Sequence, residues 1–283
     1  MSNAPLDDVT GEISLRSELI LRAQAFALTR QLSYQRTDGP IPGIIFGCDA
    51  EGRHGNFHPS SYRQISERLE WARRLNKIHT AYKRTRLRSE WEWKELDCAT
   101  SSDALLMNIF CHSPGKESLA MQGMLGIEPN TIAVFGFKPR TPLKNGRGDN
   151  TEIDMKYGDL LVEAKLTESD FQSSRPELVT RYRDFETVFE VSDLPMRHGR
   201  LRSYQLIRGT LAAYANHFGF CVLCDSRRPE LIEDWYQILH AVQLVELRPQ
   251  LKVLTWQELA SVLPEDLQHF LSEKYGIFPT TRN

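Results

Sequence analysis

Two carboxylates and one ammonium stand close together in residues 151–166, a segment that predicts two strands joined by a tight turn. Glu163 and Lys165 lie two positions apart on the second strand, so their side chains point to the same face, and Asp154 on the first strand can lie across from them. Residues 160–162 are too apolar for an exposed strand. We therefore expect a buried cluster of charges, which must be paired or bind a metal.

Two interpretations of this cluster are open. In the first, the carboxylates of Asp154 and Glu163 and the backbone carbonyl of Ala164 give a divalent metal three oxygen ligands, which suit Mg²⁺ or Mn²⁺. Such a metal activates water and steadies charge on an attacked phosphate, and Lys165 would position the water or stabilise the developing charge. In the second, Glu163 and Lys165 form a structural pair on a half-exposed strand and Asp154 is a surface residue.

The pattern of Asp154, a short hairpin and then the tripeptide Glu163–Lys165 resembles the signature of the PD-(D/E)XK nuclease superfamily, which has the restriction-endonuclease-like fold. The resemblance implies that the Asp and the Glu bind magnesium and that the Lys assists the hydrolysis of DNA. Ile153 stands where the motif has proline, a variation that the superfamily tolerates. The motif covers residues 151–166, and the order of elements extends the resemblance to about residues 100–226.

The elements around the hairpin are expected to form a central mixed β-sheet flanked by helices, an α/β fold. Ser101 is a suitable N-cap for a helix that continues to residue 110. Residues 131–137 predict a strand, and the hairpin follows. Residues 203–217 predict a helix and residues 220–224 a buried strand. Helix, three strands, helix and strand is the order of the superfamily core.

The helix predicted from residue 203 carries a further resemblance. Tyr204-Gln205 followed by Tyr214 is similar to the Gln-and-Tyr helix of RecB-like members of the superfamily. This implies that Gln205 sits beside the metal site, where its amide can point at Glu163. The alternative is an ordinary surface glutamine at a helix start. The expected catalytic residues are Asp154, Glu163, Lys165 and Gln205.

A further acidic ligand has two candidates. Many members of the superfamily carry an acidic residue on a helix before the first core strand, which here implies Glu95. Glu152 shares a strand face with Asp154 and would suit a second ion. Asp103 is assigned instead to a helix N-terminus, where a negative charge is favourable.

Residues 63–88 are strongly basic, with nine Arg or Lys residues against two Glu, and aromatic residues interleave them. Basic helices neutralise phosphates and aromatic rings stack on bases. We therefore expect a DNA-contacting helical subdomain rather than a plain solvated helix. Mobile basic loops beside the sheet are a second candidate contact surface, and the alternative is that they are plain protein surface. The predicted nucleic-acid-binding residues are Arg73, Arg74, Lys77, Arg147, Arg200 and Tyr204.

These observations divide the chain into a flexible tail at residues 1–12, a mostly helical basic subdomain at 13–100 and the nuclease-like core with C-terminal helices at 101–283. The 41% hydrophobic and 25% charged content of the 283 residues is that of a globular protein. No run of 18 apolar residues predicts a membrane span. The polar N-terminus is unlike a signal peptide, and five scattered cysteines fit a reducing compartment, so a cytoplasmic location is expected.

The predicted function is a magnesium-dependent deoxyribonuclease acting in restriction, defence or repair. DNA is the expected partner, no small-molecule cofactor is expected, and a homodimer is left open. The alternative is a non-catalytic nucleic-acid-binding protein on a degenerate nuclease fold.

Overall fold

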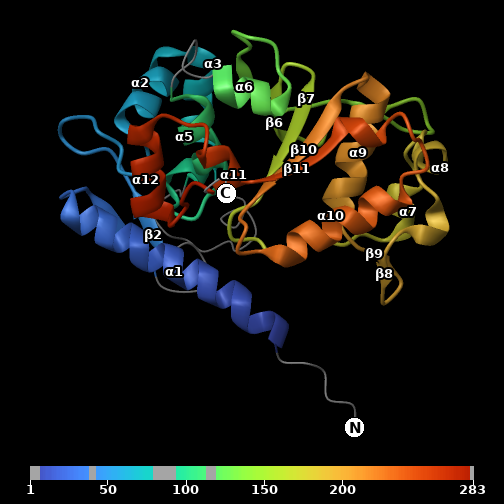
Figure 1. Cartoon of the computed structure of the whole chain (residues 1–283), viewed down its shortest axis with the longest axis horizontal. Coiled ribbons are helices and arrows are strands. Elements are labelled where there is room, and N and C mark those ends of the chain that lie inside the picture. The colour runs from blue at the N-terminus through green and yellow to red at the C-terminus, as the bar shows by residue number, and fades with distance from the viewer. Residues whose placement is uncertain (1–6, 38–42, 79–93, 113–118, 281–283) are drawn as a thin grey trace. The chain divides into compact units, whose positions relative to one another are not determined.

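The computed structural model describes residues 7–37, 43–78, 94–112 and 119–280 (Figure 1). The chain divides into two compact units. Unit 1 is formed by residues 1–130 together with 257–283, and unit 2 by residues 131–256. Each unit is described by itself below.

Unit 2 is built on a five-stranded mixed sheet with strand order β11-β10-β7-β6-β3. The strands are β3 (Ala133–Phe137), β6 (Ile153–Tyr157), β7 (Leu160–Ala164), β10 (Gly219–Cys224) and β11 (Leu251–Thr255). Strands β3, β6 and β7 are antiparallel neighbours, whereas β7, β10 and β11 run parallel. The predicted central mixed sheet is therefore confirmed, and the β6–β7 hairpin lies inside it.

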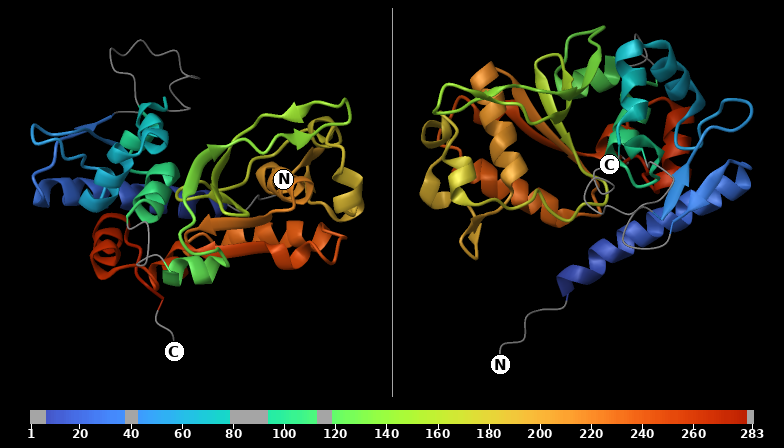
Figure 2. Two further views of the ribbon diagram at one scale, coloured as in Figure 1. Left: turned by 90° about the horizontal axis from the view of Figure 1, so that it is seen from above. Right: turned by 180° about the vertical axis from the view of Figure 1, so that it is seen from behind.

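Two long helices of unit 2, α9 (Tyr204–Asn216) and α10 (Pro229–Ala241), pack against the sheet (Figures 1 and 2). Gly209 of α9 lies directly over Phe220 of β10. A Cβ atom at this position would come within 2.3 Å of the phenyl ring. The close approach of helix to strand therefore requires glycine, and it holds the first turn of α9 near the end of β7.

Shorter elements complete unit 2. They are β4 (Thr141–Pro142), β5 (Gly148–Asp149), α7 (Pro176–Val179), α8 (Phe185–Val188), η4 (Val191–Asp193), β8 (Met196–Arg197), β9 (Arg200–Leu201) and η5 (Arg248–Gln250).

Unit 1 is mostly helical, and its first helix packs against its last. Helix α1 (Asp7–Thr29) buries an apolar stripe formed by Leu15, Leu19, Ala23 and Phe26, whose spacing places them on one face. Helix α12 (Glu265–Tyr275) contacts α1, and the rings of Phe26 and Phe270 meet edge to face with centroids 5.6 Å apart (Figure 1). The remaining elements are β1 (Tyr34–Arg36), β2 (Ile44–Phe46), α2 (Pro59–Glu67), α3 (Leu69–Ala72), η1 (Arg73–Asn76), η2 (Glu95–Asp97), α5 (Ser102–Phe110), α6 (Leu119–Leu125) and α11 (Trp256–Ala260), which begins at the boundary between the units.

A buried lysine lies under the α1–α12 contact. Lys274 is 1% exposed, and its Nζ donates hydrogen bonds to the backbone oxygen of Asn56 at 2.7 Å and to Asn56 Oδ1 at 2.5 Å. Four aromatic rings surround the ammonium at 4.8 to 5.8 Å from their centroids. Burial lowers the pKa of Lys274 well below its ordinary value, since desolvation disfavours the charged form.

The structure differs from the predicted organisation at three points. Helix α1 begins at Asp7, so half of the expected flexible tail is helical. The expected basic helix ends at Glu67, because Arg68 is extended, and the break turns Trp71 of α3 into the core. The division between the units falls after residue 130 rather than after residue 100, because α5 and α6 belong to unit 1.

Residues 79–93, which hold the rest of the basic stretch, lie outside the described residues. Among the helices that the structure does describe, none combines the length and the apolar character that a membrane span requires.

Candidate active site

The hairpin of β6 and β7 brings the two predicted carboxylates to one place. Lys156 pairs with Leu161 in the register, so the next pair on the same face is Asp154 and Glu163. The Ala164 N–H donates a hydrogen bond of 2.8 Å to Asp154 Oδ2. At the point where the two strands separate, the Asp154 side chain thus takes the place of a backbone acceptor for the Ala164 N–H. This hydrogen bond fixes one carboxylate oxygen of Asp154.

The carbonyl of Ala164 points to the same side as Asp154. In a strand the N–H and C=O of one residue face the same neighbouring strand, and the Ala164 N–H faces Asp154. The backbone of the next residue, Lys165, is held by two other partners. The Lys165 N–H donates to the Leu223 carbonyl at 2.8 Å, and Trp256 Nε1 donates to the Lys165 carbonyl at 2.8 Å. The predicted oxygen donors of residues 154, 163 and 164 therefore lie at one end of the hairpin on rigid strands.

Glu163 is 2% exposed and is surrounded by donors. Its Oε1 accepts hydrogen bonds from Gln205 Nε2 at 2.7 Å and from Lys165 Nζ at 3.1 Å. Its Oε2 lies 3.9 Å from Arg208 Nη2. A buried carboxylate without such partners would be very costly. The predicted contact between the Gln205 amide and Glu163 is present.

Lys165 is 5% exposed, and carboxylates surround its ammonium. Burial alone would lower the pKa of Lys165, but the charges of Glu163, Glu168 and Asp154 together raise it above its ordinary value. The side chain is therefore a fixed cation at neutral pH. It can donate hydrogen bonds and stabilise negative charge, but it is not a base that takes up a proton.

The residues at this site fit a divalent metal. Two carboxylates and one peptide carbonyl form an all-oxygen donor set of the kind that Mg²⁺ and Mn²⁺ prefer. The buried Oε1 of Gln205 has no hydrogen-bond partner among the described residues. A buried acceptor of this kind needs a donor, and a water molecule bound to a metal is such a donor. Asp154, Glu163 and the Ala164 carbonyl would hold the ion.

Comparison with known proteins identifies a family for most of the chain. A family model described as "Restriction Endonuclease associating with ARP" matches residues 29–276. The chain belongs to this restriction endonuclease family. No curated protein and no solved structure matched the chain in the corresponding comparisons. The α/β fold with its central five-stranded mixed sheet is accordingly a restriction-endonuclease-like fold, as the sequence predicts.

The site of this restriction endonuclease family member contains one residue that the sequence analysis missed. Arg208 lies three residues after Gln205 on α9, so both side chains share one helix face. It is 8% exposed, donates to the Glu152 carbonyl at 3.2 Å and has its Cζ 5.9 Å from the centre of the Tyr204 ring. The spacing from Gln205 was the available signal, but on this predicted helix the sequence analysis considered Tyr204, Gln205 and Tyr214 alone.

Glu152, one of the two candidates for a further ligand, lies at the start of the hairpin. Its side chain is 4.0 Å from Lys138 Nζ and half exposed. Glu95, the other candidate, belongs to η2 of unit 1, where Ser101 Oγ donates to it at 3.5 Å. A metal-binding role for either residue stays a prediction.

Tyr204 takes part in a hydrogen-bonded group beside the site. Its hydroxyl lies 3.2 Å from that of Tyr182, which donates a short hydrogen bond to Asp149. Burial and the charge of Asp149 raise the pKa of Tyr182, so this phenol stays protonated. Burial would raise the pKa of Asp149, but hydrogen bonds from Tyr182 and Thr151 lower it overall. Tyr204 is therefore oriented from within unit 2.

The basic residues predicted to contact phosphate differ in their exposure and in whether they already have partners within the protein. Arg147 and Arg73 are exposed. Arg200 donates to Ser173 Oγ and to the Ser173 carbonyl, and it lines a hollow of about 220 Å³. Arg74 and Lys77 bind the same carboxylate, with Nη2 and Nζ at 3.0 and 2.6 Å from Asp103 Oδ2. Asp103 is thus an ion-pair partner within unit 1 as well as a first-turn residue of α5.

Proposed function

We propose that this restriction endonuclease family member is a PD-(D/E)XK nuclease that hydrolyses phosphodiester bonds of DNA with Mg²⁺ or Mn²⁺. One observation carries the proposal. Buried Glu163 accepts hydrogen bonds from both Lys165 and Gln205, and Asp154 stands opposite it on the paired strand. The contact of Gln205 with Glu163 supports a RecB-like role for α9.

Each residue has a separate role in this proposal. Asp154, Glu163 and the Ala164 carbonyl bind the ion, which supplies an activated water and neutralises charge on the phosphate. The ammonium of Lys165 is already charged and already placed, so it stabilises charge that develops on the phosphate oxygens without reorganisation. Gln205 orients Glu163 and offers its free carbonyl oxygen to water. Arg208 holds the second oxygen of Glu163.

The proposal extends to partners and setting. DNA is the substrate, and exposed Arg147 and Arg73, the hollow at Arg200 and the Tyr204 ring are its proposed contacts. The family description couples a restriction endonuclease to ARP, which supports a protein partner in addition to DNA. We place the chain in the cytoplasm, in restriction, defence or repair, and include a homodimer among its proposed states.

A second candidate function is a non-catalytic nucleic-acid-binding protein. One observation favours it. Both oxygens of Glu163 already face cations or donors from Lys165, Gln205 and Arg208, so the carboxylate is compensated without any ion. A site that has lost its catalytic activity would keep this network for its contribution to the structure.

A cleavage assay separates the two functions. Linear, circular and single-stranded DNA are incubated with the protein and Mg²⁺, Mn²⁺ or EDTA. We expect cleavage that depends on the metal and is lost in Asp154→Ala and Glu163→Gln. Glu177→Gln removes an exposed carboxylate of α7 in the same unit and should cleave like the wild type. Equal cleavage by all variants would identify a contaminating nuclease, and metal-independent binding without cleavage would support the second function.

A further inference from the structure

Unit 1 contains a second cluster of side chains that are common metal ligands. The ligand atoms of His58, His112 and Asp266 all lie within 4.8 Å of one another. His112 Nε2 is 3.2 Å and His58 Nε2 is 3.7 Å from the same oxygen, Asp266 Oδ2. In a tetrahedral zinc site with bonds of about 2.0 Å, neighbouring ligand atoms are about 3.3 Å apart. The two separations from Asp266 bracket this value, and the two histidine nitrogens lie within 4.8 Å of each other.

Three separate elements bring the cluster together. His58 is the N-cap of α2, His112 follows α5, and Asp266 is in the first turn of α12. The Leu267 N–H donates to Asp266 Oδ1 at 2.9 Å, which leaves Oδ2 facing the imidazoles. The side chain of His112 is buried, that of His58 is partly buried, and that of Asp266 is 56% exposed. Phe270 packs edge to face against His58 at 5.5 Å.

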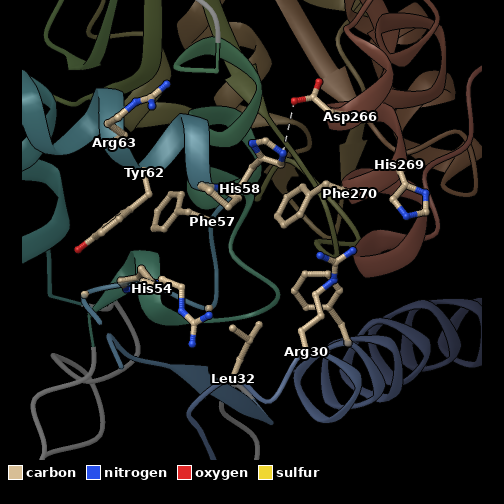
Figure 3. A pocket seen from close by; sticks show the side chains of 15 residues that line it. Arg30, Leu32, His54, Phe57, His58, Tyr62, Arg63, Asp266, His269 and Phe270 are labelled. Carbon is tan, nitrogen blue, oxygen red and sulfur yellow. Dashed lines mark ion pairs between the residues drawn. The ribbon is translucent and has the colours of Figure 1, made fainter. Parts of the chain in front are cut away.

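The cluster opens onto a pocket of about 800 Å³ that lies wholly within unit 1 (Figure 3). His58 and Asp266 line this pocket together with Phe57, Tyr62 and Phe270, and the side chain of His58 points toward Asp266. His112 is not a lining residue. An ion held by the three side chains would therefore have protein on one side and open coordination positions toward the pocket. That arrangement is typical of catalytic or ligand-binding zinc, since structural zinc sites are closed.

We propose that His58, His112 and Asp266 bind a divalent transition-metal ion whose open positions face the pocket of unit 1. Two imidazoles and one carboxylate suit Zn²⁺, Fe²⁺ or Co²⁺, whereas Mg²⁺ prefers oxygen ligands alone. The site is independent of the oxygen ligands of the β6–β7 hairpin and requires no role for them.

Binding through His58 rearranges one hydrogen bond. His58 Nδ1 accepts from the Ser60 N–H at 3.2 Å, so the neutral ring carries its proton on Nε2. When Nε2 binds an ion, the proton moves to Nδ1 and the Ser60 amide loses its acceptor. The amide resonance of Ser60 at the start of α2 is therefore a local reporter of ion binding.

Zinc titration of the full chain tests the site. The protein carries Glu163→Gln and Cys48→Ser, which remove a hairpin ligand and the exposed thiol as competitors for zinc. After treatment with a chelator, Zn²⁺ is added and followed by calorimetry and by the Ser60 amide resonance. We expect one zinc ion per chain. Asp266→Asn and His112→Ala should each weaken binding at least about 100-fold, since even outer-shell changes cost 10- to 100-fold.

His269→Ala is the matched control, because His269 is an exposed histidine of α12 that lines the same pocket and pairs with Glu273 at 3.1 Å. It should bind zinc like its parent. His112 is buried, so its replacement can affect folding. Asp266→Asn keeps the test valid because it preserves shape at an exposed position. Absence of bound zinc, wild-type affinity in Asp266→Asn, or an equal loss in His269→Ala would each overturn the proposal.

Discussion

Two buried lysines, one in each unit, have pKa values shifted in opposite directions. Lys165 in unit 2 and Lys274 in unit 1 are almost equally hidden, at 5% and 1% exposure. The pKa of Lys165 is nonetheless raised, and that of Lys274 is lowered. Lys165 has Glu163 at 3.1 Å, whereas the Lys274 ammonium meets the neutral oxygens of Asn56 and aromatic rings among the described residues. Neighbouring charge, and not depth, decides the sign of the pKa shift.

The opposite pKa shifts indicate different roles for the two lysines. A lysine kept charged beside carboxylates is ready to stabilise negative charge on a phosphate. A lysine buried without a carboxylate contributes hydrogen bonds and packing, and its protonation acts against the folded state. The predictions below test this contrast, beginning with the largest expected effect.

Replacing Lys165 by Ala should lower the rate of DNA hydrolysis ~100-fold or more, because a preorganised cation is lost at the site where charge develops. Binding of DNA and of the metal should persist, since the oxygen ligands remain. Single-turnover cleavage at saturating DNA, with binding measured separately in Ca²⁺, gives both quantities. Near-normal turnover would make Lys165 a structural partner of Glu163 and favour the non-catalytic function.

Replacing Arg208 by Ala should have a smaller effect on the same site. Arg208 Nη2 lies 3.9 Å from Glu163 Oε2, so in the proposed mechanism it acts on the site by holding that ligand. Changes of this kind cost about tenfold in metal affinity or activity. The rate should fall while the KM for DNA is kept, and Arg208→Lys should recover part of the loss because it retains the charge. A change in the KM for DNA without a change in rate would instead assign Arg208 to substrate binding.

Replacing Lys274 by Met should change how stability depends on pH. Because the folded-state pKa of Lys274 lies below the ordinary value of 10.5, the unfolded chain binds the extra proton between these two values. The free energy of unfolding due to this group therefore rises with pH in that window, by up to about 1.4 kcal/mol per pH unit.

The measurement is denaturant unfolding of the wild type and of Lys274→Met at several pH values above neutrality. The wild type should gain stability relative to the variant as pH rises, and Lys138→Met, which removes a half-exposed lysine, is the control for the loss of one lysine. Parallel pH profiles for the wild type and Lys274→Met would show that Lys274 is charged in the folded protein.

The hairpin site was predictable because its chemistry is local. Asp154, Glu163 and Lys165 lie within a single hairpin, and strand periodicity places them on one face without any knowledge of the rest of the chain. Gln205 was predicted through the resemblance to RecB-like members of the superfamily. That resemblance implied its long-range contact with Glu163, which sequence spacing alone does not predict. The mixed sheet was predicted from the order of helices and strands along the chain. That order can be predicted from the spacing of apolar residues.

Long-range partners were not predictable. His58, His112 and Asp266 come from three distant segments, so their spacing carries no metal-ligand pattern. Likewise, nothing near Arg74 and Lys77 in the sequence shows that both bind Asp103. Arg74 and Lys77 were predicted to contact phosphate from the number of basic residues in their segment, which does not show that a carboxylate elsewhere in the chain pairs with them. Arg73 is exposed, and its contact with DNA stays a prediction.

Unit 1 is formed by two parts of the chain that are separated by the whole of unit 2. Helix α1 is synthesised before unit 2, but α12, which packs on it, is synthesised after unit 2. At translation rates of 5–20 residues per second, the interval is on the order of tens of seconds. Throughout that time the apolar stripe of α1 lacks its partner, while residues 131–256 can already fold. Premature termination after residue 256 would thus release a complete sheet domain joined to a helical domain that cannot close.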